Sequence, residues 1–173
     1  MFNDWVRDVR IIGIDPGTYR TGYGIIDESG GKMKTVAFGC IECTDKVVSQ
    51  RYLEIYDQII AIIKEFQPDQ CAIESAFFFK NPKVLMRLGE IRGALILSAA
   101  QGGLEIFEYS PLEVKKSVTG YGKADKSQVH KMVKMILAID KIDGANDVSD
   151  ALALAICHVH NKKSFKLKII KTI

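Results

Sequence analysis

A short apolar run that ends in a carboxylate limits what the start of this chain can become. Residues 10–18 read Arg-Ile-Ile-Gly-Ile-Asp-Pro-Gly-Thr, and the β-branched stretch predicts a buried strand that ends at Asp15. An acid in this position is costly unless something pairs with it. Two interpretations stay open from this stretch alone. Asp15 either belongs to an acidic site that holds a metal ion or phosphate, or caps the turn at Pro16 and Gly17.

Composition predicts one globular domain with no membrane-spanning segment. The 173 residues fit a single domain, and a hydrophobic content of 47% with 26% charged residues argues against disorder. No apolar run approaches membrane-spanning length, and the first residues carry Asp4 and Asp8 where a targeting segment would be positive. We expect a cytoplasmic protein with a domain at 1–161 and a basic C-terminal tail at 162–173.

Basic residues are unevenly distributed, although the formal net charge is only +3. The tail contains five lysines, and no acid follows Asp150. A second basic stretch contains Lys115, Lys116, Lys123, Lys126, Lys131 and Lys134. Such patches are compatible with a phosphate-backbone partner, whereas a solvated face is the alternative for any single lysine.

Cysteine and histidine spacing favours structural roles. Cys40 and Cys43 form a lone CxxC pair, and a zinc site would need two more ligands. We therefore expect the four cysteines to be small core residues. The three histidines are expected to have ordinary surface or core roles; they are His130, His158 and His160.

The order of the predicted elements is that of an α/β domain with a mixed sheet. After the first strand we expect strands at 21–27 and 33–41, a helix at 49–66, a strand at 71–74, a helix at 82–101, a strand at 104–109, and helices that begin near 111, 126 and 146. Glycine-rich turns predict an antiparallel meander for the first three strands. The crossover rule predicts that the strands ending at Asp15 and Glu74 are parallel neighbours.

Two helices carry more detailed expectations. The first is expected to bury one face, made of Leu53, Tyr56, Ile59, Ile60, Ile63 and Phe66. The second begins after the N-cap Asn81, with Pro82 at its first position. Its interior contains Gly89 and Gly93, which lower helix propensity and suggest that another backbone approaches closely.

Four acids can converge at one edge of this sheet. Asp147 and Asp150 are spaced i, i+3 in the first turn of the last helix, where the helix dipole alone would also favour them. With Asp15 and Glu74 they would repel one another unless a cation intervened. Carboxylate oxygens suit Mg²⁺ or Mn²⁺. Two such ions about 3.5–4 Å apart can activate a water and stabilise a leaving 3′-oxygen, which is nuclease chemistry.

Six motifs in order and spacing resemble those of the RuvC-type Holliday-junction resolvases: 13–17 (GIDPG), 72–74 (AIE), 80–81 (KN), 88–93 (LGEIRG), 124–129 (ADKSQV) and 147–153 (DVSDALA). The resemblance implies a ribonuclease H-like fold with a five-stranded mixed sheet, a three-strand antiparallel meander plus two parallel strands, flanked by helices on both faces. It further implies a homodimeric, Mg²⁺-dependent endonuclease that resolves four-way DNA junctions by paired nicks in recombination and repair. A branch-migration complex of the RuvA and RuvB type is the implied partner.

The same resemblance implies roles for individual residues. The catalytic and metal-binding acids would be Asp15, Glu74, Asp147 and Asp150, although some members carry His at the third position. Phe77 would stack on bases near the junction point, and Lys115 and Lys126 would hold the scissile phosphate. Further DNA contacts are expected from Thr18, Arg20, Lys80 and Lys123. The helix that contains Gly89 is expected at the dimer interface.

Three other functions were weighed against this one. A phosphotransferase of the actin and sugar-kinase type shares a loop resembling 14–18 but needs a second lobe that this chain is too short to contain. In a non-catalytic junction-binding module, four retained acids facing a phosphate backbone would weaken binding unless metal intervened. A related nuclease acting on structured RNA fits the middle and C-terminal motifs less well.

Overall fold

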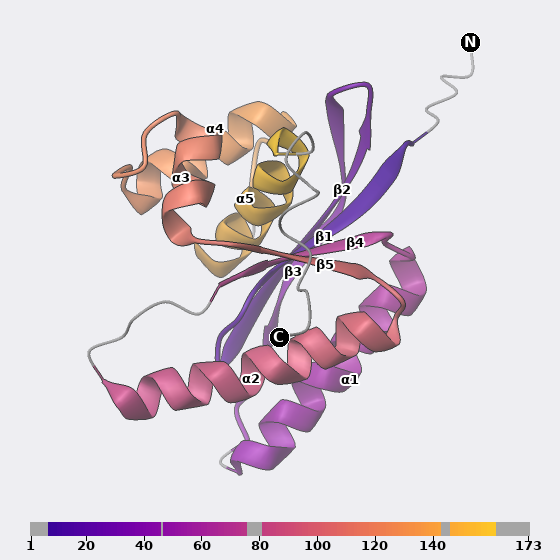
Figure 1. Cartoon of the computed structure of the whole chain (residues 1–173), viewed down its shortest axis with the longest axis vertical. Coiled ribbons are helices and arrows are strands. Elements are labelled where there is room, and N and C mark those ends of the chain that lie inside the picture. Colours follow the sequence, from indigo (N-terminus) through magenta and orange to yellow (C-terminus); the bar gives the residue numbers. More distant parts are fainter. Residues whose placement is uncertain (1–6, 46, 76–80, 143–145, 162–173) are drawn as a thin grey trace.

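A computed structural model describes residues 7–45, 47–75, 81–142 and 146–161 (Figure 1). The expectations for Phe77, Lys80 and the tail at 162–173 fall outside these residues. The elements are, in chain order, β1 (Val9–Asp15), β2 (Arg20–Ser29), β3 (Lys32–Glu42), α1 (Val48–Phe66), β4 (Gln70–Glu74), α2 (Pro82–Gln101), β5 (Glu105–Tyr109), α3 (Pro111–Thr119), α4 (Lys126–Leu137) and α5 (Asn146–His160).

The strands form one mixed sheet in the order β3-β2-β1-β4-β5. β1 pairs antiparallel with β2 and β2 with β3, which confirms the meander. β1 and β4 pair parallel, and so do β4 and β5. Because Ile14 is opposite Ile73, the next residues along these two strands, Asp15 and Glu74, lie at the same edge of the sheet.

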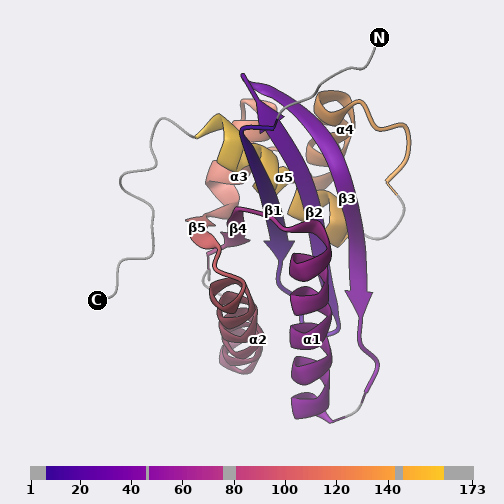
Figure 2. The same cartoon turned by 90° about the vertical axis from the view of Figure 1, so that its right-hand side faces the viewer.

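Helices cover both faces of the sheet (Figure 1), as the resemblance implied. One apolar core lies under α1 and α2, which pack side by side in Figure 2. A second core lies under α3, α4 and α5 on the other face. The isoleucines of β1 alternate between the two cores, so that Ile11 faces α5 while Ile12 and Ile14 face α1 and α2.

α5 is the most deeply buried helix among the described residues. Every residue from 151 to 159 is buried, and the helix packs against β1 and β2. A Cβ atom on Gly13 would lie 2.0 Å from the carbonyl oxygen of Ala151, and one on Gly22 would lie 2.1 Å from that of Asp147. Helix and strand backbones are therefore in direct contact, which fixes the height of the first turn of α5 above the strand ends.

The buried face of α1 differs from the predicted one. Arg51, Ile55, Ile59 and Ile63 are buried, whereas the side chain of Leu53 is 53% exposed. The prediction was right for Ile59 and Ile63 and wrong for Leu53, because the buried stripe begins with a charged residue. The Arg51 guanidinium donates to the carbonyl oxygen of Asp45 and stacks on the ring of a tyrosine in the β1–β2 loop, so a cation occupies a position that hydrophobic spacing assigns to solvent.

α2 begins as the sequence predicts. The Asn81 side chain accepts a hydrogen bond from the backbone amide of Lys83, and Pro82 is the first helical residue. Nothing described in this chain comes within 4 Å of a Cβ atom placed on Gly89 or Gly93. The expected close approach of a second backbone is therefore wrong within the described chain.

The structural roles expected for cysteine and histidine are confirmed. Cys43, Cys71 and Cys157 are buried free thiols, whereas Cys40 is half-buried and packs against the core from its edge. His158 is fully buried, its Nδ1 lies 2.7 Å from the hydroxyl of Tyr109, and its Nε2 lies 2.9 Å from Oε1 of Gln70. Burial lowers the pKa of this imidazole to about 4, so it is neutral at physiological pH.

None of the helices in the described part of the chain combines the length and the apolar character that a membrane span needs.

We expect Gly13→Ala to destabilise the fold by about 3 kcal/mol or more, because the added methyl meets backbone atoms of α5 that cannot move independently. Gly122→Ala is the matched control, since its methyl meets the flexible end of Leu112 at 2.6 Å, and we expect a cost below about 1 kcal/mol. Urea unfolding of both variants measures the difference. Equal costs would contradict the contact between α5 and β1.

Candidate active site

Asp15 and Glu74 end the parallel strands β1 and β4, and the first turns of α5 face them across the sheet edge. A pocket of about 290 Å³ opens between these elements. Its walls are formed by Asp15, Glu74, Pro111, Val114, Lys115, Lys126, Val129, Asp150 and Leu154. Three of the four predicted acids thus share one pocket with two of the predicted lysines, while Asp147 lies beside it.

Burial and neighbouring negative charges raise the pKa of the two acids at the strand ends, Asp15 and Glu74. The pKa of Asp15 is raised to about 8, mainly by burial and then by the negative charges of Asp150, Glu74 and Asp147. Burial, followed by Asp150, also raises the pKa of Glu74. Lys126 opposes both shifts. All four acids are therefore close enough to interact, as the sequence predicted.

Each of the two acids on α5 is paired with a cation. Lys126 Nζ lies 2.9 Å from Oδ2 of Asp150, and this contact raises the pKa of the lysine. Arg20 Nε lies 3.2 Å from Oδ2 of Asp147, while its Nη2 lies 2.8 Å from Oε1 of Glu42. Within the described ranges, no three acid, histidine or cysteine side chains already form a cluster that could hold a metal ion. An ion that joined Asp150 to Asp15 would compete with Lys126 for the Asp150 carboxylate.

Of the other predicted DNA contacts, one lines the pocket and the rest lie in loops or outside the described residues. Lys115 lines the pocket itself. Thr18 is half-buried in the loop after β1, and Lys123 is exposed in the turn between α3 and α4. Phe77 and Lys80 lie outside the described residues, between Glu74 and the start of α2.

Two residues that support the site were missed in the sequence. Arg92 of α2 donates from Nε to the backbone carbonyl of Glu74 at 3.0 Å, which ties the end of β4 to the helix. Glu42 pairs with Arg20. The hairpin register contained a signal for the second contact, because Arg20 and Glu42 are directly opposite in the β2–β3 pair.

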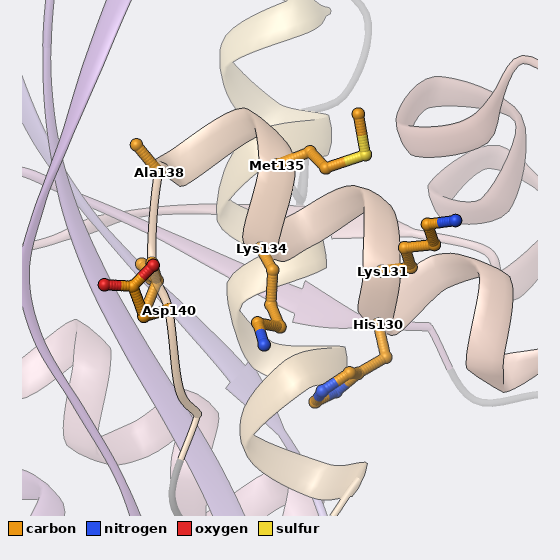
Figure 3. A pocket seen from close by; sticks show the side chains of 7 residues that line it. His130, Lys131, Lys134, Met135, Ala138 and Asp140 are labelled. Atoms are coloured by element: carbon orange, nitrogen blue, oxygen red, sulfur yellow. The ribbon is translucent and has the colours of Figure 1, made fainter.

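A second hollow lies along α4 (Figure 3), and none of the four acids is among the residues that line it. It measures about 530 Å³ and is lined by His130, Lys131, Lys134, Met135, Ala138, Ile139 and Asp140. Figure 3 shows His130 and Lys134 pointing to the same side of the helix. With three basic side chains and one carboxylate, this hollow suits an anion better than a metal ion. The acid chemistry therefore belongs to the first pocket.

We expect Asp15→Asn to stabilise the protein at pH 8 in the presence of a chelator. The folded state binds a proton at Asp15 more tightly than the unfolded chain does, so the free energy of unfolding falls as the pH rises from about 4 to about 8. Asparagine removes this loss, and we expect a gain on the order of 1 kcal/mol or more at pH 8 that vanishes near pH 4. Chemical denaturation across this range, with the exposed Asp57→Asn as control, measures it. A gain that did not depend on pH would contradict the raised pKa.

Comparison with known proteins gives a consistent family. The family profile described as crossover junction endodeoxyribonuclease RuvC matches residues 11–158. A crossover junction endodeoxyribonuclease RuvC of Caldicellulosiruptor saccharolyticus is 47% identical over 158 residues, covering 90% of this chain and 95% of the relative. The protein of the same name from Thermosipho melanesiensis is 48% identical over 151 residues, covering 86% of this chain and 96% of the relative.

Solved structures show the same fold. T. thermophilus RuvC in complex with Holliday junction substrate superposes with a TM-score of 0.86 at 25% identity, covering 94% of this chain and 99% of that one. The yeast mitochondrial Holliday junction resolvase Ydc2 shares the fold at 13% identity, with a TM-score of 0.67 over 95% of this chain and 83% of its own. Profile, relatives and fold agree, and the chain belongs to the RuvC family of crossover junction endodeoxyribonucleases.

Proposed function

We propose that this chain resolves four-way DNA junctions by paired nicks during recombination and repair, with residues 1–161 as the nuclease domain. The observation that carries the proposal is the meeting of four carboxylates from β1, β4 and α5 at one edge of the sheet, where burial and then the charges of the other three raise the pKa of Asp15. A polyanionic substrate would be repelled by this cluster unless a cation entered it. Family membership supports junction DNA as the substrate.

We propose Mg²⁺ as the natural cofactor, with Mn²⁺ able to replace it and two ions at each site. The donor set fits, because Asp15, Glu74, Asp147 and Asp150 offer only hard oxygen ligands. Bound ions would supply an activated water and stabilise the leaving 3′-oxygen. Asp15 would be the central ligand, since its carboxyl interacts with each of the other three.

The cations around the pocket would bind the scissile phosphate of the DNA. Lys115 lines the pocket, and Lys126 would move from Asp150 to the scissile phosphate when an ion takes over the carboxylate. Lys123, Thr18 and Lys80 would contact the backbone of the DNA and fix its position. Phe77 would stack on a base near the junction point.

We propose that α2 forms the interface of a two-fold dimer, since a nearly two-fold junction requires two matched cuts. α2 exposes Val84, Met86 and Leu97, and Gly89 and Gly93 leave open space on its surface. Helices approach most closely where glycines face each other, so the space at these glycines would admit the partner's α2. A branch-migration complex of the RuvA and RuvB type would deliver the junction.

The test of activity uses a mobile four-way junction and a linear duplex of the same sequence, with and without Mg²⁺. We expect symmetric nicks in the junction only, and we expect Asp15→Asn to reduce nicking by at least about 1,000-fold while junction binding persists, because a central ligand is lost. Denaturing gels measure the nicks and a mobility shift measures binding. Binding without any nicking would favour the non-catalytic module, and preferential cleavage of structured RNA would favour the RNA nuclease.

The dimer is tested by Gly89→Leu. Nothing in the described part of the same chain lies within 4 Å of a Cβ atom here, so the folded protomer should tolerate the larger side chain. A closely packed helix pair should not, and we expect a shift from dimer to monomer at micromolar concentration with little change in far-ultraviolet circular dichroism. Lys131→Leu on α4 is the control. A monomeric wild-type protein, or a dimeric Gly89→Leu variant, in light scattering would contradict the proposed interface.

A further inference from the structure

Arg20 stands between a carboxylate of the acid cluster and one outside it. Its Nε lies 3.2 Å from Asp147 and its Nη2 lies 2.8 Å from Glu42. We propose that Arg20 and Glu42 are positioning residues that hold Asp147 in the orientation needed to bind a divalent cation, and that Arg20 does not act as a DNA backbone contact. This inference rests on the proposed role of Asp147 as a metal ligand.

The sheet places the three side chains together. A Cβ atom on Gly22 would point at the backbone of Asp147, so this face of β2 is the one that meets α5. Side chains two residues apart on a strand share a face, and Arg20 therefore projects to the same side as Gly22. Glu42 is the direct partner of Arg20 on β3 and shares that face as well. The contact follows from the strand register and does not depend on a loop conformation.

Asp147 stays accessible to an ion while it contacts Arg20. The shortest contact joins Nε of Arg20 to Oδ2 of Asp147 at 3.2 Å, and the Asp147 side chain is 29% exposed. The planar guanidinium has nitrogens on different edges, so Arg20 can contact Asp147 through Nε and Glu42 through Nη2 at the same time. These two contacts would favour one orientation of Asp147 before an ion arrives. Partners that orient a metal ligand commonly change metal affinity by 10- to 100-fold when removed.

Glu42 makes this arrangement compatible with metal binding. An unbalanced guanidinium beside the cluster would repel a divalent cation and would compete for the carboxylate. Glu42 supplies the opposite charge at 2.8 Å, so the pair contributes orientation with little net charge. Without Glu42, the full positive charge of Arg20 would act on Asp147 alone. Loss of either residue should therefore weaken metal binding. Without Arg20 the orientation of Asp147 is lost, and without Glu42 the positive charge of Arg20 is unbalanced.

The backbone-contact role predicts a different pattern. If Arg20 bound a phosphate, Glu42 would oppose that contact, and Glu42→Gln would strengthen junction binding. Arg20→Lys would keep most of the function, since a lysine also binds phosphate. If Arg20 positions Asp147, lysine should fail, because a single ammonium group lacks the fork that joins the two carboxylates. The lysine and glutamine variants thus separate the two roles.

The experiment measures Mn²⁺ binding to the DNA-free protein by calorimetry and junction binding in EDTA by fluorescence anisotropy. For Arg20→Ala, Arg20→Lys and Glu42→Gln we expect Mn²⁺ affinity to fall by about tenfold or more, with junction affinity in EDTA changed by less than about twofold. Lys34→Ala, which removes an exposed cation from the far end of β3, should change neither. Thermal melting in EDTA checks that each variant is folded.

Two results would overturn the inference. One is an Arg20→Ala variant that binds Mn²⁺ as well as the wild type or better, which would mean that the guanidinium only competes with the ion. The other is weakened junction binding in EDTA for Arg20→Ala with recovery in Arg20→Lys, which would establish a backbone contact. Neither measurement uses nicking, so a wild-type protein that binds Mn²⁺ but cuts no junction would contradict the proposed function and leave this inference standing.

Discussion

The contact between the α5 backbone and the glycines of β1 and β2 is the constraint on which the rest of the site depends. Gly13 and Gly22 let the carbonyl oxygens of Ala151 and Asp147 come within about 2 Å of where a Cβ atom would stand. No residue with a side chain could permit this approach. Because the helix rests directly on the strands, its first turn is held at the edge where β1 and β4 end. The distance between the first turn of α5 and the strand ends is therefore defined by backbone contact and does not depend on side-chain packing elsewhere.

This placement has an electrostatic cost that the chain offsets only in part. Asp15 is buried among like charges, and the penalty on its ionised form lowers stability as the pH rises from about 4 towards 8. Lys126 and Arg20 offset the negative charge of the two acids on α5, Asp150 and Asp147, which are the more accessible ones. His158 acts in the opposite direction, since the folded state resists its protonation and stability therefore falls as the pH drops from about 6.5 to about 4. The acid cluster and the buried histidine thus favour different ends of the pH range.

Local patterns in the sequence were enough to predict most of the fold and the convergence of the acids. Ser110 and Asp125 begin α3 and α4 with capping boxes, and the parallel pairing of β1 and β4 followed from the crossover rule. The start of the buried face of α1 could not be predicted, because Arg51 is buried by a stacking contact with a residue more than thirty positions away. The pairing of Lys126 with Asp150 was equally hidden, since it joins two helices whose relative rotation depends on the core beneath them.

The cations that hold the acids also define what a divalent ion must displace. Lys126 sits on α4, whose start is anchored by the Asp125 capping box, so its ammonium group can swing while its backbone stays fixed. Arg20 is held at both ends, by Glu42 and Asp147. Arg20 would keep its contact with Glu42 if an ion took over the Asp147 carboxylate. Of the two cations, Lys126 is the one suited to leave its carboxylate and bind the phosphate of the substrate. Arg20 is suited to remain beside Asp147 and keep its carboxylate in place.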